Sequence, residues 1–270
     1  MPPIRVHVRR GDVVEAVHRV HAASTAGDAV GDPQLTCFLR SSLKPIQAIP
    51  LVEGYDDVTD AEVAIACASH QAEPAQLDAV RTLLARADAT VDDLECGEQE
   101  GRPEGKLGHN CSGKHAGMLA ACRAHGWPPH PYRAPGHQLQ RRIAELVGST
   151  HTAVDGCGVP TFAMTLAEMA EVFARTPARV ADAMRARPDL VGGTDADDTE
   201  LMRALPGWIA KRGAEGLLCA LAPDGVAWAV KVEDGAARAL RPALGQLLGV
   251  DAFRSVPVRN SLGEVVGSIR

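Results

Sequence analysis

Apolar and polar residues alternate at the start of the chain, which is typical of strands with one buried face. The stretch IRVHVRRGDVVEAVHRVHAAS, residues 4–24, is broken once, at the turn signal Arg10-Gly11-Asp12. Near the other end, LLCALAPDGVAWAVKVEDG, residues 217–235, is broken at Pro223-Asp224-Gly225. One more strand is expected in residues 263–270. The pattern therefore predicts strands at both ends of the chain.

Between these ends, apolar residues recur at the three- and four-residue spacing of helices. The first helix is expected near Ser41 and Lys44, because Pro45 is tolerated only in a first turn. Thr59 is a plausible N-cap for the second helix, which should end near His70. Residues 96–108 are polar and glycine-rich, which indicates a loop. Further helices are expected over residues 73–88, 112–126, 137–149, 159–177 and 236–249.

This order of elements favours an α+β fold. The terminal strands would pair into one antiparallel sheet flanked by helices, with a helical lobe between them. Residues 1–270 would then form a single two-lobe domain in which roughly residues 41–205 are mainly helical.

Composition narrows the class of function. The 270 residues are 46% hydrophobic and 23% charged, with a net charge of −6, which is ordinary for a soluble globular protein and gives no basic surface for nucleic acid. No apolar run approaches the roughly 18 residues of a membrane span. The opening MPPIRVHVRR has no apolar core of a signal peptide. With seven cysteines, an odd number, we expect reduced thiols and a cytoplasmic protein.

Residues 108–115, GHNCSGKH, resemble a phosphate-binding loop with His115 in place of the usual Ser or Thr. The residues before them are polar, although such a loop follows a buried strand, so nucleotide binding is disfavoured. A metal site suits the same residues better, with Cys111 as a thiolate and His109 and His115 as imidazoles. Asp155 and Cys157 lie on a second tight turn, VDGCG. The alternative is a pair of structural cysteines and a solvated loop.

The stretch SSLK holds a third candidate. The chain has 28 basic residues but only five lysines, so each lysine is worth attention, because arginine cannot serve as a base. Ser41 and Lys44 are three residues apart and share a face on a helix. S-x-x-K is the nucleophile motif of serine β-lactamases and penicillin-binding proteins. The β-lactamase arrangement also has a second serine at a helix end and a second lysine on a later strand, and Ser69 and Lys231 occupy these places in the same order. The K-[ST]-G and S-D-N triplets of that arrangement are absent. Ser42 is the rival, as a helix cap.

Several blocks together resemble the asparaginase II family, the type named for the Rhizobium etli enzymes. They occur in the family's order, as RSSLKPIQAIPL, ACASHQAEP, CGEQ, GHNCSGKHAGML, VDGCGVPTFAMTL, RGAEGLLCAL and AVKVEDG. The resemblance covers nearly the whole chain. It implies the serine β-lactamase-like fold, hydrolysis of L-asparagine to aspartate and ammonia, and a homodimer.

The resemblance also implies roles for single residues. The family's site has two serine–lysine tandems, which fall here on Ser41 with Lys44 and on Ser69 with Lys231; Lys211 is the alternative second lysine. Its zinc site, of two cysteines and a lysine, falls on Cys111, Lys114 and Cys157. The implied substrate-binding residues are Arg40, His70 and Asp155. The zinc would position rather than activate the substrate.

The sequence therefore predicts an L-asparagine amidohydrolase that uses Ser/Lys nucleophilic catalysis beside a zinc site. Two alternatives stay open. One is a β-lactamase-like hydrolase of another amide or ester, such as glutamine or a peptide-like substrate. The other is a zinc-binding homologue without catalytic activity.

Overall fold

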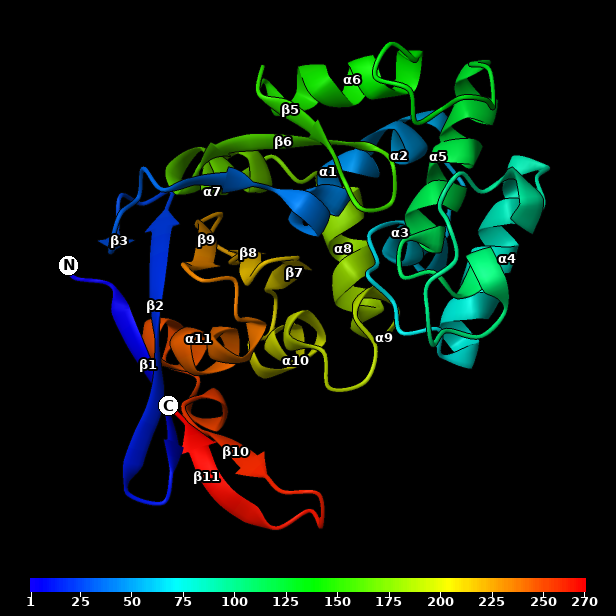
Figure 1. The fold of residues 1–270 in the computed structure, drawn as a ribbon. Coiled ribbons are helices and arrows are strands. Elements are labelled where there is room, and N and C mark those ends of the chain that lie inside the picture. The colour runs from blue at the N-terminus through cyan, green and yellow to red at the C-terminus, as the bar shows by residue number, and fades with distance from the viewer. The chain divides into compact units, whose positions relative to one another are not determined.

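The computed structural model describes all 270 residues, with eleven strands and eleven α-helices (Figure 1). Contacts within the chain divide it into two compact units. Unit 1 comprises Met1–Cys37, Thr165–Ala174 and Arg212–Arg270, and unit 2 comprises Phe38–Met164 and Arg175–Lys211.

Unit 1 is built on an antiparallel sheet with the strand order β10-β11-β1-β2-β9-β8-β7, to which β3 adds by pairing with β2. Its elements are β1 (Ile4–Arg10), β2 (Val13–Ser24), β3 (Ala29–Val30), α7 (Leu166–Ala174), β8 (Leu217–Leu221), β9 (Ala227–Val232), α11 (Leu240–Leu248), β10 (Val256–Arg259) and β11 (Val265–Ile269). Helix α7 contacts β2, β8 and β9, and helix α11 contacts β1 and β9. The last strand of the sheet, β7 (Ile209–Gly213), contains the boundary between the units.

The alternating apolar and polar residues of the N-terminal segment form strands with one buried face, as the sequence predicts. Val6, Val8 and Val20 are buried on one face of β1 and β2, while the residues between them are more exposed. The chain reverses at Gly11, and β1 pairs antiparallel with both β2 and β11. The first and last strands of the chain thus share one sheet, which confirms the expected α+β fold class with an antiparallel sheet of terminal strands.

Unit 2 holds the remaining helices and a three-stranded sheet of order β4-β6-β5. Its elements are β4 (Thr36–Phe38), α1 (Lys44–Gln47), α2 (Ile49–Gly54), α3 (Asp60–Ala66), α4 (Pro74–Ala87), α5 (Ser112–His125), α6 (Gln138–Val147), β5 (Thr152–Val154), β6 (Pro160–Thr165), α8 (Ala178–Ala186), α9 (Pro188–Val191) and α10 (Asp197–Ala204). Boundaries between the units also fall inside β4 and β6.

Helix α5 forms the centre of unit 2. It contacts α2, α3 and α4 (Figure 1), and its residues Ser112–Cys122 are buried on every side. Two glycines allow this close packing. A Cβ atom at Gly113 would lie 2.2 Å from the carbonyl oxygen of Ile65 on α3, and one at Gly117 would lie 2.8 Å from the Cβ of Ala66. The backbone of α5 therefore passes directly against α3.

Local signals placed several helices correctly. Thr59 caps α3 through a capping box with Glu62, in which each side chain accepts from the other residue's backbone N–H. Helix α5 ends at Gly126, which has a positive φ of 66° and supplies the left-handed cap.

The expected single helix over residues 159–177 is wrong. Residues 160–165 form β6, and only α7 is helical. The reason is non-local pairing, because β6 pairs with β5 (Val154↔Pro160) and the carbonyl of Phe162 accepts the N–H of Leu39 at 2.9 Å. The sequence patterns also missed β7, β10 and the three helices α8–α10.

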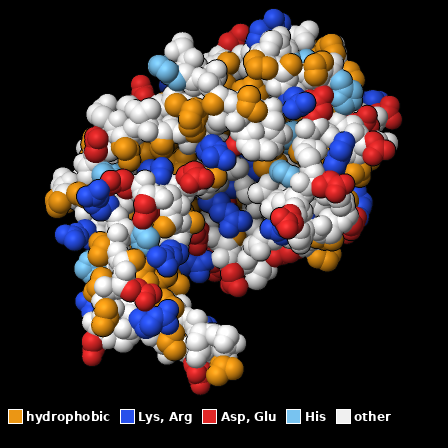
Figure 2. All heavy atoms as spheres, in the orientation of Figure 1, with side chains coloured by type: hydrophobic (Ala, Val, Ile, Leu, Met, Phe, Trp, Pro, Cys, Tyr) orange, Lys and Arg blue, Asp and Glu red, His pale blue; other side chains and the backbone are white.

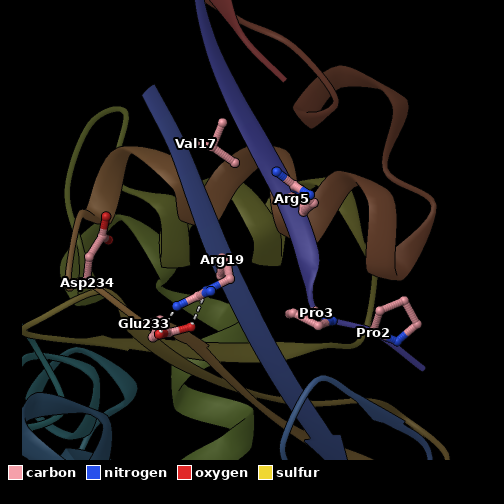
Figure 3. A pocket seen from close by; sticks show the side chains of 7 residues that line it. All are labelled: Pro2, Pro3, Arg5, Val17, Arg19, Glu233 and Asp234. Atoms are coloured by element: carbon pink, nitrogen blue, oxygen red, sulfur yellow. Dashed lines mark hydrogen bonds and ion pairs between the residues drawn. The ribbon is translucent and has the colours of Figure 1, made fainter. Parts of the chain in front are cut away.

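The charged side chains on the surface agree with the modest net charge of −6. On the face shown in Figure 2, acidic and basic side chains are interspersed. A surface pocket of about 530 Å³ in unit 1 is lined by Arg5, Val17, Arg19, Glu233 and Asp234, together with Pro2 and Pro3 (Figure 3). Arg19 and Glu233 form a two-pronged ion pair there, at 2.7 and 2.5 Å, so this pocket offers paired charges and no nucleophile. None of the helices has the length and apolar character needed to cross a membrane.

Candidate active site

Hydrogen bonds hold the residues on both sides of Ser41, and the Ser41 carbonyl accepts the backbone N–H of Lys44. Arg40 donates its backbone N–H to Thr161 Oγ1 at 3.1 Å, and Ser42 donates its hydroxyl to the carbonyl of Lys211 at 3.1 Å. The segment forms a short 3₁₀ turn, Arg40–Leu43, directly before α1. Ser41 is half-buried in this turn and its hydroxyl makes no hydrogen bond. The fold thus fixes the backbone of Ser41 and leaves its oxygen available.

Lys44 is a buried amine beside Ser69. Its side chain is 1% exposed, and Nζ donates to the carbonyl of Ala68 and, at 3.0 Å, to Ser69 Oγ. Ser69 follows α3 and is itself buried. The structure therefore brings Lys44 to Ser69, whereas no hydrogen bond joins Lys44 to Ser41. The 3₁₀ turn separates the two, because Ser41 lies before the helix that Lys44 begins.

His70 is fully buried, and both of its ring nitrogens have partners inside unit 2. Nδ1 accepts the N–H of Ala72 at 3.1 Å, so Nε2 carries the proton and donates to Ser112 Oγ at 2.8 Å. The Ser112 hydroxyl in turn donates a hydrogen bond to the carbonyl of Leu107 at 2.7 Å. Burial, followed by the charge of Lys44, lowers the pKa of His70 to about 3. His70 is therefore a neutral link between the end of α3 and the start of α5.

A second group of side chains gathers where α5 begins. Cys111 is the residue before α5, Lys114 lies in its first turn, and Cys157 lies in the turn between β5 and β6. All three are buried, and Lys114 Nζ lies 2.8 Å from Cys157 Sγ. A hydrogen bond from Cys157, aided by the charges of Lys44 and Lys114, holds the pKa of Cys111 well below its ordinary value despite burial. Burial alone would lower the pKa of Lys114, but the charges of Cys157 and Cys111 raise it.

His115 borders the same group. Tyr132 OH accepts the N–H of Glu95 at 2.7 Å and lies 2.7 Å from Nδ1 of His115. If the hydroxyl donates to Nδ1, both groups are satisfied and the ring proton sits on Nε2. That Nε2 atom is buried and has no hydrogen-bond partner of ordinary length. Burial lowers the pKa of His115 to about 4, and the nearby Cys157 offsets this shift only in part. His109, by contrast, uses Nδ1 to accept the N–H of Cys111 at 3.0 Å.

The side chains at the start of α5 offer zinc two sulfur ligands and one nitrogen ligand. No group of three or more His, Cys, Asp or Glu side chains is arranged to hold a metal. Two thiols and an amine do meet, at Cys111, Cys157 and Lys114, and soft sulfur and nitrogen donors are those that zinc prefers. The adjacent unpartnered nitrogen of His115 marks the same spot as polar and incompletely satisfied. The donor set therefore fits zinc, provided that the lysine serves as the third ligand.

Arg40 and Asp155 connect the two groups. Arg40 Nε donates to Asp155 Oδ1 at 2.6 Å, and Asp155 lies two residues before Cys157. Burial would raise the pKa of Asp155, but the hydrogen bond from Arg40 and the charge of Lys114 hold it below its ordinary value. Two of the three residues predicted to bind substrate, Arg40 and Asp155, are thus engaged with each other.

The two lysines considered for the second tandem, Lys231 and Lys211, differ in their surroundings. Lys231 lies in unit 1, on β9, and its Nζ donates to the carbonyl of Val232. Lys211 lies in unit 2, is fully buried and forms an ion pair with Asp198 at 3.0 Å. The assignment of Lys231 to the second tandem stays a prediction.

Several residues of the site had no signal in the sequence. Thr161, Ser112, Tyr132 and Asp198 contact the predicted residues through the tertiary structure alone. A single polar residue on a helix or in a loop is ordinary and attracts no attention. Ser112 and Thr161 do stand within blocks already singled out, GHNCSGKHAGML and VDGCGVPTFAMTL, but neither block gives them a role.

Comparisons with solved structures return distant matches. A β-lactamase from Mycobacterium bovis is 15% identical, with 84% of this chain and 86% of that chain covered and a TM-score of 0.31. A candidate β-lactamase from Bacteroides dorei is 14% identical, with 91% and 93% covered and a TM-score of 0.41. Scores this low add no weight to the assignment of fold or function. No curated protein matches the chain significantly.

The family comparison is decisive. The family model described as L-asparaginase II matches residues 6–270, which is nearly the full length of the chain. The matched region contains Ser41, Lys44, Ser69 and the group at Cys111, Lys114 and Cys157. The chain belongs to the L-asparaginase II family.

Proposed function

We propose that this amidohydrolase cleaves the side-chain amide of L-asparagine and releases aspartate and ammonia. Membership of the L-asparaginase II family gives the class of reaction, and the serine and lysine side chains of unit 2 supply a nucleophile and a base for it. A cytoplasmic homodimer is the form that we expect for the enzyme.

The observation that carries the proposal is the contrast between Ser41 and its neighbours. A nucleophile needs a fixed backbone and a free oxygen, and Ser41 has both. The hydroxyl of Ser69, in comparison, already accepts a hydrogen bond from Lys44. We therefore assign the attack to Ser41 and assign to Ser69 the transfer of a proton to Lys44.

In the proposed reaction, Ser41 Oγ attacks the amide carbon and its proton passes through Ser69 to the amine of Lys44. A neutral amine has two N–H groups and one lone pair. One N–H of the neutral amine stays on the carbonyl of Ala68. The lone pair faces Ser69 across the 3.0 Å contact, so the Ser69 hydroxyl donates its proton to Lys44 as it takes up the proton of Ser41. The proton then goes to the departing nitrogen as the C–N bond breaks, and ammonia leaves. Water hydrolyses the Ser41 ester and restores the hydroxyl.

The second tandem follows from the family resemblance. Ser69 with Lys231 would complete the pair of serine–lysine sets, and Lys211 is the alternative lysine. The buried ion pair of Lys211 with Asp198 favours a structural role for Lys211, because an amine held by a carboxylate retains its proton. Arg40, His70 and Asp155 are proposed to line the substrate site, with His70 acting through Ser112 rather than by a free ring nitrogen.

Zinc is part of the proposal. Cys111, Lys114 and Cys157 would hold the ion, and the two thiolates would balance its charge. Thiolate ligands lower the Lewis acidity of zinc, so its expected contribution is to fix the surrounding side chains. The steps of bond formation and proton transfer remain with the serines and Lys44.

The first experiment measures ammonia release from L-asparagine by the purified protein. Ser41→Ala and Ser69→Ala should each lower kcat by at least about a thousandfold, because each removes a member of one catalytic unit. Ser261→Ala, a change at an exposed serine, is the matched control and should leave the rate unchanged. Activity that survives in Ser41→Ala would refute the assignment of the nucleophile.

The same assay separates the alternatives. L-glutamine and nitrocefin test hydrolysis of another amide and of a β-lactam. Zinc bound to a protein that releases ammonia from neither amide would favour the zinc-binding homologue without activity.

Zinc content is measured on the same samples. Cys111→Ser and Cys157→Ser should each lose bound zinc, because a serine hydroxyl does not ionise at neutral pH and is a poor ligand. Cys37→Ser, a change in unit 1, is the control and should keep it. Full zinc content in both ligand variants would refute the proposed metal site.

A further inference from the structure

Arg40 has a backbone conformation that its residue type disfavours. Its φ is +47°, in the left-handed region, where Cβ and the backbone carbonyl crowd each other in every residue except glycine. Six non-glycine residues of the chain share this feature, and Arg40 is the one directly before Ser41. Strain of this kind persists only where surrounding contacts enforce it.

Two contacts enforce it here, and both come from the β5–β6 hairpin. The backbone N–H of Arg40 donates to Thr161 Oγ1 at 3.1 Å, and its side chain donates to Asp155 Oδ1 at 2.6 Å. The ion pair is largely shielded, with side-chain exposures of 28% for Arg40 and 11% for Asp155.

Asp155 is itself fixed in place. Its carboxylate also accepts the N–H of Gly156 at 2.8 Å, and its own backbone N–H donates to the carbonyl of Val159 at 2.8 Å. The position of the carboxylate is therefore set by the same turn that carries Cys157. A shift of that turn would be passed to Arg40 through the ion pair.

We propose that Arg40 is a positioning residue, whose ion pair with Asp155 and backbone bond to Thr161 hold the chain in the left-handed conformation that aims the Ser41 hydroxyl. This inference deepens the proposed function and rests on Ser41 as its nucleophile. It replaces a substrate contact as the main role of Arg40, and it ties the geometry of Ser41 to the turn of Cys157.

Glycine and alanine at position 40 distinguish the two roles. Both substitutions remove the guanidinium, but only glycine adopts a positive φ without cost. In Arg40→Ala the turn should relax and misplace Ser41, which lowers kcat by about a hundredfold. Arg40→Gly can still reach the native turn, so its kcat should exceed that of Arg40→Ala by at least about tenfold. If both variants instead keep their kcat and raise KM to the same extent, Arg40 contacts the substrate and the proposal is overturned.

The contribution of Asp155 is tested by a double-mutant cycle. Asp155→Asn should lower kcat in the wild-type background but much less in Arg40→Gly, because the ion pair is already gone. Zinc content is measured for each variant, so that an effect on Cys157 is separated from an effect on Ser41. Additive losses would overturn the link through Asp155. Arg123→Ala, which breaks a surface ion pair with Asp88 in the same unit, is the matched control.

A measurement without substrate keeps this inference separate from the proposed function. Arg40→Gly should unfold at a higher temperature than Arg40→Ala, whereas at a position with negative φ glycine is the less stable of the two. A crystal structure of Arg40→Gly should retain a positive φ at residue 40. If the wild type releases no ammonia but this order of stability holds, the proposed function fails and the enforced conformation stands. The reverse order of stability overturns the inference.

Discussion

At the scale of single residues, unit 2 gains its order from buried polar side chains with specified partners. His70 shows the consequence for pH. Its pKa in the folded protein is about 3, below the ordinary value of 6.5, so the unfolded chain binds a proton first as the pH falls. The free energy of unfolding should therefore decrease between about pH 6.5 and pH 3, with a slope of up to about 1.4 kcal/mol per pH unit from this residue.

Urea unfolding at pH 7 and pH 5 tests this prediction. The wild type should lose about 2 kcal/mol more between the two pH values than His70→Gln, which cannot take up the proton. The exposed His151→Gln is the control and should follow the wild type. The same pH dependence in wild type and His70→Gln would contradict the assigned protonation.

At the scale of elements, the packing of α5 against α3 decides whether the site forms. α5 begins beside Cys111, and α3 ends just before Ser69, so the distance between these helices sets the spacing of both groups. Gly113 makes that distance short, since a Cβ there would lie 2.2 Å from Ile65 O. Gly113→Ala should lower the free energy of unfolding by about 1–3 kcal/mol through overpacking.

The comparison for this prediction is Gly136→Ala. Gly136 has no atom within 4 Å of an added Cβ, so its substitution should be neutral or slightly stabilising. Chemical unfolding of both variants measures the difference. If Gly113→Ala proves as stable as Gly136→Ala, the close contact of α5 with α3 is not a constraint.

At the scale of the whole molecule, the sheet of unit 1 joins the two ends of the chain. His7 and Arg270 exchange backbone hydrogen bonds at 2.7 and 3.0 Å, and β2 pairs with β9 in a register that places His21 opposite Lys231. Contacts of such long sequence separation form only when nearly the whole chain is present. A chain that ends at Arg254 lacks β10 and β11 and should expose the edge of β1.

Hydrogen exchange and size-exclusion chromatography test this prediction. In the truncated chain the amide of His7 should exchange faster, and the protein should tend to associate through the unpaired edge. Leu262→Ser, a change in the exposed turn between β10 and β11, is the control and should behave like the wild type. Unchanged protection of His7 would show that β11 does not stabilise β1.

Some features of the candidate site depend on neighbouring residues in the sequence, and others depend on distant ones. The motifs around Ser41, Ser69 and Cys111 could be recognised because each is a short run of reactive residue types. The residues that these motifs contact could not be recognised from the sequence. Lys44 bonds to Ser69, 25 residues away, and Lys114 contacts Cys157, 43 residues away, because of how the helices and the β5–β6 turn pack.

The sequence by itself determined the features that depend on near neighbours. Alternation set the terminal strands, the capping box of Thr59 with Glu62 started α3, and the left-handed Gly126 ended α5. Only the tertiary structure decided that β6 is a strand, because its hydrogen-bond partners come from β5 and Leu39, outside any local window. It also decided the strained conformation of Arg40, since Thr161 and Asp155, which enforce it, lie more than a hundred residues further along the chain.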